Sequence, residues 1–278
     1  MVQEHSGPGK VDVLGRPEIF TRHHRLAMVY GGGGTFGISY TAGVAAGLEA
    51  AGVPVRTAPA LGTSAGSWTA SAMALGLEYD DLAVLTSPRV PVRRSGILAD
   101  LARQVFGEAT HPNVAISAVC VRSRRRHILD GGRYPLADLV AASSAVPGLL
   151  PPHRVDGRLY VDGGMWSVTS VDAAAEAEHV IVVAPLAGAV LGPMGRTAGF
   201  LLHRELRRWR QRHPESTVTL INPDREMARV AGLRPLALFD DGRAREVYPM
   251  AVEQGVAYGK ALARSWPSAR RVDTDPAA

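Results

Sequence analysis

Short apolar runs alternate with segments of helical spacing along most of the chain. The run 26–30 is apolar and stops at four consecutive glycines, and a helical spacing of apolar residues follows over 38–51. A second extended segment covers 53–61, and it leads through a sharp turn into a helix of small residues over 67–75. This repeated order of strand, tight loop and helix predicts βα units.

The same alternation continues toward the C-terminus. Further strands are predicted over 114–121, 125–129, 158–161, 179–184 and 217–221, with helical patterns between most of them. Strands that alternate with helices form a parallel sheet covered on both faces. An Asp-Gly pair at 156–157, between two extended runs, also predicts one hairpin. We therefore expect an α/β fold, a three-layer α/β/α sandwich with a mostly parallel central sheet.

The two ends of the chain differ from the part between them. Residues 1–22 and 267–278 are mostly polar and contain prolines, and we expect both to be flexible tails. Residues 23–266 are expected to form one domain, because a chain of 278 residues is long enough for a single large core.

Composition narrows the classes of function. The net charge of +5 comes from a surplus of arginine, which weakly favours anionic surfaces. The chain shows neither Cys/His zinc spacing nor interleaved basic and aromatic residues, so we expect no metal and no nucleic acid. The longest apolar stretch, 180–191, is shorter than the roughly 20 residues of a membrane helix. No signal sequence is visible, so a cytoplasmic location is expected. Cys120, the single cysteine, is expected to be a core residue.

The turn at 62–66 carries the first candidate for chemistry. Its sequence, Gly-Thr-Ser-Ala-Gly, matches G-x-S-x-G, in which a serine sits on a strained turn between a strand and a helix with its hydroxyl exposed. The pattern alone also recurs in proteins that are not hydrolases. Its place between an extended segment and a helix favours the catalytic interpretation, because the helix dipole stabilises a developing alkoxide. Ser64 is therefore the predicted nucleophile.

The glycines at 31–34 form the second candidate. They lie between a predicted strand and a predicted helix, where backbone amides can converge on an anion and form an oxyanion hole. The alternative is a dinucleotide-binding oxidoreductase, since Gly32, Gly34 and Gly37 satisfy G-x-G-x-x-G. A Rossmann unit needs an acidic residue at the end of its second strand, and 53–58 contains none.

Asp162 is the candidate base, because it ends a predicted strand and precedes two glycines. Asp-Gly is also a common turn, and Asp130, which precedes two further glycines, is interpreted as an ordinary turn residue. A histidine-dependent triad is an alternative, since His179, His203 and His213 follow Asp162 in the chain order of α/β-hydrolases. A surface or structural role is the simpler interpretation of each histidine.

The combination of these motifs is more specific than any one of them. It consists of the loop Gly32–Gly37, the elbow Gly62–Gly66, and Asp162-Gly163 preceded by Ser144–Gly148. Together these segments resemble the patatin-like phospholipases over about residues 25–185. The resemblance implies a patatin-like fold.

The resemblance also assigns roles. It implies that Ser64 and Asp162 act as a dyad without histidine, and that Gly32, Gly33 and Gly34 supply the oxyanion hole. It further implies a hydrolase that cleaves fatty-acyl esters of lipids without a cofactor. The family often places Arg or Lys where this chain has Phe36. A catalytically inactive binding module of the same fold therefore remains an alternative.

A basic segment, Gly199–His213, has a separate interpretation. Leu202, Leu206 and Trp209 follow helical spacing in it, and arginines occupy much of the remaining surface. Such a helix either makes peripheral contact with an anionic membrane or packs its apolar stripe on the domain with a solvated outer face.

Overall fold

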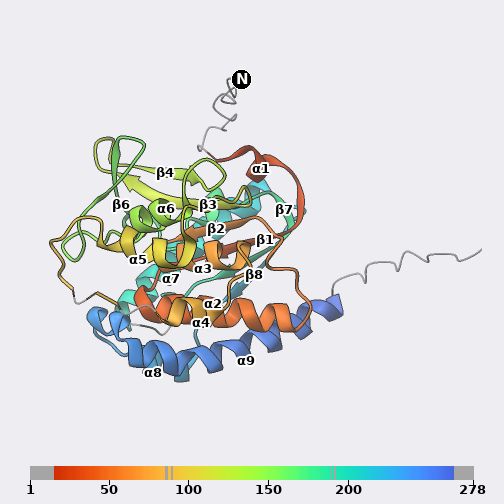
Figure 1. The fold of residues 1–278 in the computed structure, drawn as a ribbon. Coiled ribbons are helices and arrows are strands. Elements are labelled where there is room, and N and C mark those ends of the chain that lie inside the picture. The colour runs from red at the N-terminus through yellow and green to blue at the C-terminus, as the bar shows by residue number, and fades with distance from the viewer. Residues whose placement is uncertain (1–15, 85–86, 89, 189, 191, 266–278) are drawn as a thin grey trace, which may run out of the picture.

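A central sheet of eight strands carries the fold in the computed structural model, which describes residues 16–84, 87–88, 90–188, 190 and 192–265 (Figure 1). The strands are β1 (His24–Tyr30), β2 (Ala60–Thr63), β3 (Val114–Cys120), β4 (Arg125–Asp130), β5 (His153–Val155), β6 (Arg158–Asp162), β7 (Ala177–Val183) and β8 (Thr217–Ile221). They are ordered β5-β6-β3-β2-β1-β7-β8, and β4 also pairs with β3.

The middle of the sheet is parallel. Strands β3, β2, β1, β7 and β8 are parallel neighbours, whereas β4, β5 and β6 form antiparallel pairs. Tyr30 at the end of β1 pairs with Gly62 of β2 and with Val183 of β7. The loops that follow these strands therefore meet at one edge of the sheet, and the predicted, mostly parallel sheet is confirmed.

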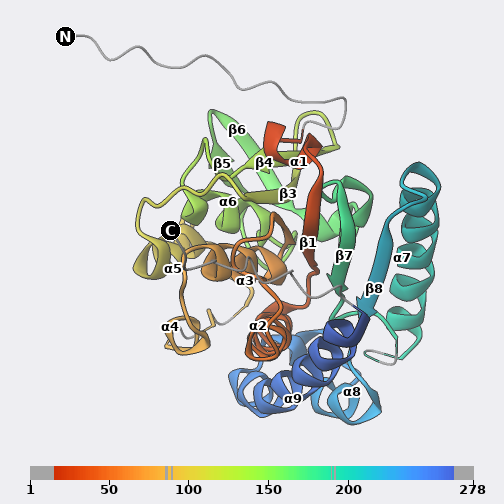
Figure 2. The same cartoon turned by 90° about the vertical axis from the view of Figure 1, so that its right-hand side faces the viewer.

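Alternating side chains of the buried strands face two separate cores. Met28 and Tyr30 of β1 belong to the larger core, and Ala27 and Val29 belong to the smaller one. The larger core is covered by α2 (Gly34–Ala50), α3 (Ala65–Ala74), α5 (Ile97–Phe106), α6 (Leu136–Ser143), α8 (Arg225–Ala231) and α9 (Asp241–Ser265). The smaller core is covered by α7 (Pro193–Arg212) and the short α1 (Glu18–Thr21), and Figure 2 shows α7 on the other side of the sheet from α2 and α3. Together they form the expected three layers.

Two segments differ from the sequence-based expectation. The second strand is shorter than the predicted 53–61, because prolines at 54 and 59 remove two backbone donors that a ladder needs. At the N-terminus, Phe20 is fully buried and the Arg16 guanidinium donates to the Ala174 carbonyl over 2.9 Å. The packed domain thus begins before the predicted boundary at residue 23. The rest of the predicted tails, 1–15 and 267–278, lies outside the described residues.

Three smaller expectations agree with the structure. Strands β5 and β6 form the predicted hairpin, in which Asp156 and Gly157 have φ of 47° and 74°. Cys120 is a buried, unbridged core residue. In the part of the chain that the structure describes, no helix combines the length and apolar character needed to cross a membrane.

Candidate active site

The register of the sheet brings Ser64 and Asp162 to the same level. Thr63, the last residue of β2, pairs with Ser117 of β3, and Ser64 directly follows Thr63. On the other side of β3, Asp162 pairs directly with Ala118. Strands β2 and β6 flank β3 and are therefore about two strand spacings, or about 9.6 Å, apart, a gap that two side chains directed toward each other can span.

Ser64 sits on a strained turn between β2 and α3. Its φ of 51° and ψ of −120° are unusual for a residue with a side chain, and such strain is typical of a nucleophile elbow. The turn is tight enough to require the flanking glycines. A Cβ at Gly62 would lie 2.5 Å from the Cα of Ser67, and one at Gly66 would lie 2.0 Å from the Tyr30 carbonyl oxygen.

Ser64 and Asp162 form a direct hydrogen bond. The Ser64 hydroxyl donates to Oδ2 of Asp162 over 2.6 Å, and the Gly164 amide donates to Oδ1 over 2.6 Å. Both side chains are buried, Ser64 at 8% exposure and Asp162 at 4%. Burial raises the pKa of Asp162 to about 6, and the two hydrogen bonds oppose that rise. A carboxylate of this pKa is a stronger base than an ordinary aspartate and is still ionised at neutral pH.

A buried serine, Ser143, accepts a hydrogen bond from the backbone of the elbow. The Ser64 amide donates to Oγ of Ser143 over 2.8 Å, and the Ser143 hydroxyl donates to the Ser117 carbonyl over 2.7 Å. Ser143 therefore connects the elbow to β3 and satisfies a buried amide. Sequence reasoning missed Ser143. Its only signal was its place directly before the Ser144–Gly148 segment.

The glycine loop lies against the elbow. A Cβ built on Gly32 would be 3.2 Å from the Cβ of Ser64. The Gly32 amide itself is occupied, since it donates to the Val168 carbonyl over 2.8 Å. Among the described residues, by contrast, the amides of Gly33 and Gly34 have no hydrogen-bond acceptor. Two of the three predicted donors therefore have no acceptor within the described part of the chain.

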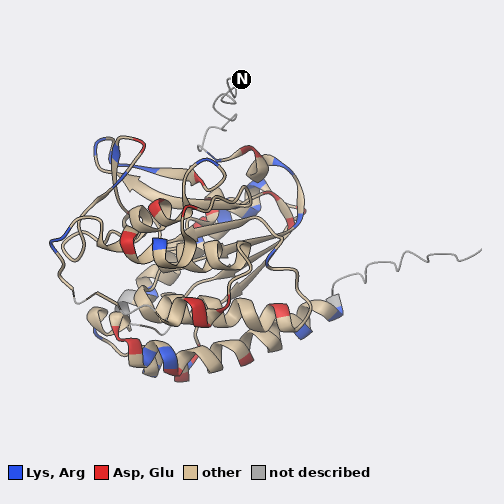
Figure 3. Cartoon of the chain, in the orientation of Figure 1, with Lys and Arg blue, Asp and Glu red and all other residues tan. Residues whose placement is uncertain are grey.

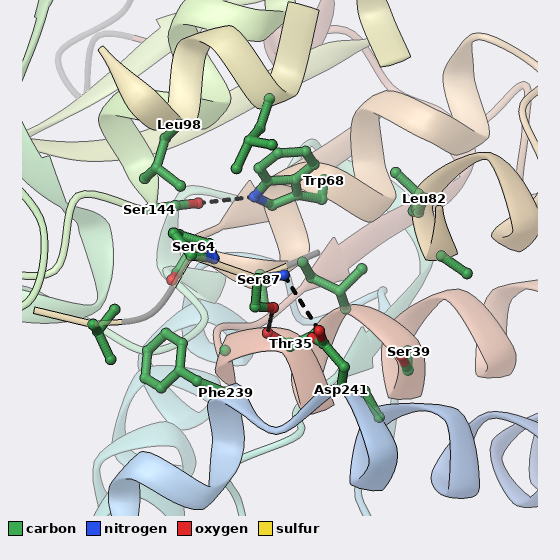
Figure 4. A pocket seen from close by; sticks show the side chains of 18 of the residues that line it. Thr35, Ser39, Ser64, Trp68, Leu82, Ser87, Leu98, Ser144, Phe239 and Asp241 are labelled. Atoms are coloured by element: carbon green, nitrogen blue, oxygen red, sulfur yellow. Dashed lines mark hydrogen bonds between the residues drawn. The ribbon is translucent and has the colours of Figure 1, made fainter. Parts of the chain in front are cut away.

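A cavity that opens to solvent reaches Ser64 (Figure 4). Most of its lining side chains are apolar, and they include Ile38, Trp68, Leu82, Leu98, Leu101, Val146, Leu150 and Phe239. The Trp68 indole donates to the Ser144 hydroxyl over 3.1 Å, which fixes one side of the cavity. A cavity with a mostly apolar lining and a few polar groups suits a ligand with an apolar part.

Phe36 lies in the core. It is fully buried and stacks on Tyr40 with ring centroids 6.3 Å apart. The position at which the family often has Arg or Lys therefore contributes packing under α2 in this chain.

The three candidate histidines have other partners. His179 bonds Thr219, His203 bonds the Gly199 carbonyl, and His213 stacks on Trp209. No hydrogen bond among the described residues joins an imidazole to the Ser64–Asp162 pair. The geometry therefore favours the dyad over a histidine triad.

Asp130 lacks the surroundings of Asp162. Its Oδ1 accepts from the Gly132 amide over 2.8 Å in the same kind of local turn, but its hydrogen bond is solvent-exposed. Both Asp-Gly-Gly segments form the same local hydrogen bond. What distinguishes Asp162 from Asp130 is its position in the sheet, where it meets Ser64.

Comparison with known protein families assigns the chain to a family. The family model described as "Patatin-like phospholipase" matches residues 28–175, more than half of the 278-residue chain. The chain belongs to the patatin-like phospholipase family. Membership in this family implies a lipid acyl hydrolase, and the matched residues include Ser64 and Asp162.

Other comparisons add little detail. No curated protein matches the chain. Ten chains of solved structures match, and among them is VipD from Legionella pneumophila, at 13% identity and a TM-score of 0.44 over 87% of this chain and 67% of that one. Within the described residues, no group of three or more His, Cys, Asp or Glu side chains is placed to hold a metal.

Proposed function

We propose that this patatin-like protein hydrolyses fatty-acyl esters of lipids, with Ser64 as the nucleophile and Asp162 as its general base. The observation that carries the proposal is the 2.6 Å hydrogen bond from the Ser64 hydroxyl to Oδ2 of Asp162. A nucleophile bonded directly to a base of raised pKa is the arrangement that activates an alcohol.

The reaction runs in two steps. Asp162 takes the proton as Ser64 Oγ bonds to the ester carbonyl carbon, and the leaving alcohol then departs with that proton. Water next attacks the acyl-serine ester and gives its proton to Asp162, and the proton returns to Ser64 as the fatty acid leaves. Each cycle consumes one water and leaves both side chains unchanged.

The amides of Gly33 and Gly34 are the proposed oxyanion donors. They lack acceptors among the described residues, and they lie at the N-terminus of α2, where the helix dipole favours negative charge. The Gly32 amide is bonded to the Val168 carbonyl, so Gly32 is assigned the role of holding the loop beside Ser64. This narrows the predicted set of three donors to two.

The apolar cavity is the proposed acyl site. Trp68, Leu98, Leu101 and Leu150 line it and offer a surface suited to a hydrocarbon chain. A series of p-nitrophenyl esters tests the assignment. We expect kcat/KM to rise with acyl length by roughly a factor of four per buried methylene, since each contributes about 0.8 kcal/mol. Ser64→Ala should abolish turnover of every ester in the series. Equal turnover of acetyl and long-chain esters would contradict the assignment.

Contact with an anionic membrane through α7 is a second, separate proposal. Leu202, Leu206 and Trp209 are buried against the sheet, so the helix does not lay its apolar stripe on lipid. Its outer face carries exposed arginines, among them Arg204, Arg207, Arg208 and Arg210, which have no ion-pair partner among the described residues. On α8 and α9, by contrast, basic and acidic residues are interspersed (Figure 3).

Vesicle sedimentation tests this contact. Each basic residue near an anionic surface contributes about 1 kcal/mol, so glutamine at positions 204, 207 and 208 should weaken binding to anionic vesicles at low salt. Binding that is unchanged by the substitutions and by salt would show that α7 is only a solvated helix.

A further inference from the structure

One wall of the cavity carries three connected polar residues, Thr35 of α2, Asp241 of α9 and Ser87 in the segment 87–88. The Thr35 and Ser87 hydroxyls are hydrogen-bonded over 2.6 Å, and the Ser87 amide donates to Oδ2 of Asp241 over a long 3.4 Å. All three line the cavity. In Figure 4, this polar group lies across the cavity from Trp68 and Leu98. The cavity therefore has an apolar wall and a wall that offers polar contacts.

Asp241 is poorly satisfied in this arrangement. Its Oδ1 is covered from solvent and has no hydrogen-bond partner among the described residues, and its Oδ2 has only the long bond from Ser87. An ionised carboxylate accepts up to about four hydrogen bonds, and a buried oxygen without a partner destabilises the folded protein. Such a deficit at the wall of a binding cavity indicates a group that a ligand satisfies.

The polar wall begins next to the reacting centre. Thr35 directly follows Gly34, one of the two proposed oxyanion donors, and the glycine loop lies against Ser64. The acyl and alcohol parts of an ester diverge from the carbonyl carbon. When the acyl chain lies along the Trp68 wall, the alcohol part is therefore directed toward the wall of Thr35 and Asp241.

We propose that Asp241 binds the alcohol part of the substrate and selects esters whose alcohol carries a hydrogen-bond donor, a hydroxyl or an ammonium group. This inference rests on the proposed ester hydrolysis at Ser64. Rotation about the Asp χ2 angle is soft, so either carboxylate oxygen can turn to the donor. Asp241 lies outside residues 28–175, so this selectivity belongs to a part of the chain beyond the family match.

Arg245 can distinguish the two kinds of substrate that carry such a donor, a phospholipid and an uncharged glycerol ester. It lies one turn after Asp241 on α9, lines the same cavity and is exposed. A phospholipid head group would place its phosphate within reach of this guanidinium, whereas an uncharged glycerol ester has no group that needs it.

The test compares three esters of one fatty acid: a 1-monoacylglycerol, the same ester with both free hydroxyls methylated, and a lysophospholipid with an ethanolamine head group. We expect wild type to prefer both donor-bearing esters over the methylated one, measured as kcat/KM. Asp241→Ala should lower each preference roughly tenfold to a hundredfold, which is the loss of a hydrogen bond to a charged group, about 1.5–3 kcal/mol, converted at about 1.4 kcal/mol per factor of ten. Asp241→Asn, which conserves size, should keep more of the preference for the hydroxyl ester than for the ammonium ester.

Asp240→Asn is the matched control. Asp240 is exposed, caps α9 by accepting from the Arg243 amide over 3.0 Å, and does not line the cavity. Its substitution should leave both preferences unchanged. Arg245→Gln identifies the source, because a loss confined to the lysophospholipid indicates a phospholipid head group and no loss indicates an uncharged polyol.

Two results separate the possible failures. If wild type hydrolyses the methylated ester as well as the others, or if both Asp241 variants keep the preference, the assignment of Asp241 is overturned while ester hydrolysis at Ser64 stands. If wild type hydrolyses none of the three esters and Ser64 does not react with an active-serine probe, the proposed function fails, and the assignment of Asp241 fails with it.

Discussion

Replacing Asp162 by asparagine is expected to stabilise the protein in a pH-dependent way while removing its activity. Burial raises the pKa of Asp162 from 3.8 to about 6. Below about pH 4 the residue is protonated in both the folded and the unfolded chain, so it adds no pH dependence. Between about pH 4 and 6 the unfolded chain releases the proton and the folded chain keeps it, so the free energy of unfolding falls as pH rises.

The size of the effect follows from the shift. Each pKa unit corresponds to about 1.4 kcal/mol, so the buried carboxylate lowers the free energy of unfolding by about 3 kcal/mol above pH 6. Asparagine has no charge to bury, and its side chain can still accept from Gly164 and donate to Ser64. The stability difference between Asp162→Asn and wild type should therefore increase by up to about 3 kcal/mol between about pH 4 and 8.

Urea denaturation at these two pH values measures the change. Asp130→Asn is the control, because Asp130 makes the same local bond to the glycine two residues on but in an exposed turn. The control should show no comparable increase and should keep its turnover, whereas Asp162→Asn should lose roughly 10² to 10⁴ in rate. If Asp162→Asn gains nothing between about pH 4 and 8, the carboxylate is not desolvated and the argument for its basicity is wrong.

Three further predictions concern the same site. In a pH–rate profile, kcat/KM should rise as pH increases through about 6, because Asp162 acts as a base only when ionised; a profile that is flat from about pH 5 to 8 would contradict this. Ser143→Ala should lower thermal stability and reduce kcat roughly tenfold, because it leaves the Ser64 amide buried without a partner. Unchanged kinetics would show that the turn at Ser64 keeps its geometry without this hydrogen bond. Gly34→Ala should destabilise the protein by more than about 1 kcal/mol in urea denaturation, since Gly34 has a φ of 62° and a Cβ there would lie 2.7 Å from the Leu238 carbonyl; wild-type stability would mean that the loop relaxes.

Local patterns were enough to predict the layers and most of the strands. Apolar runs over 114–121 and 179–184 predicted β3 and β7 to within a few residues, because strands buried on both faces are continuously apolar. The second strand was overestimated. Val53 and Val55 are buried but do not belong to the sheet, so the prediction of an extended segment over 53–61 placed the start of the strand too early.

The site residues that lie in recognisable local motifs could be predicted from the sequence. Ser64 was found from the glycines that its turn requires, and Asp162 from its place at the end of a strand. The register that aligns the end of β2 and Asp162 of β6 with neighbouring residues of β3 is a long-range property, which no local pattern contains. For the same reason Ser143 was missed, since a serine that satisfies a distant amide looks like any other serine at the end of a helix.

Contributions from distant segments to the cavity were also beyond local patterns. Asp241 begins α9 far along the chain from Ser64, and only the packing of α9 on α2 brings it to the cavity wall. The hydrogen bond of the Gly32 amide could not be predicted for the same reason. Its acceptor, the Val168 carbonyl, lies far along the chain, in the segment that follows Asp162.

The central claim is that Ser64 is an activated nucleophile, and labelling with a fluorophosphonate tests it most directly. The probe phosphonylates only serines whose hydroxyl is activated, and mass spectrometry of the digested protein identifies the modified residue. We predict a single adduct on Ser64 in the wild type, no adduct in Ser64→Ala, and much slower labelling in Asp162→Asn. Labelling of Ser64→Ala at the wild-type rate, or no reaction of the folded wild type, would contradict the account.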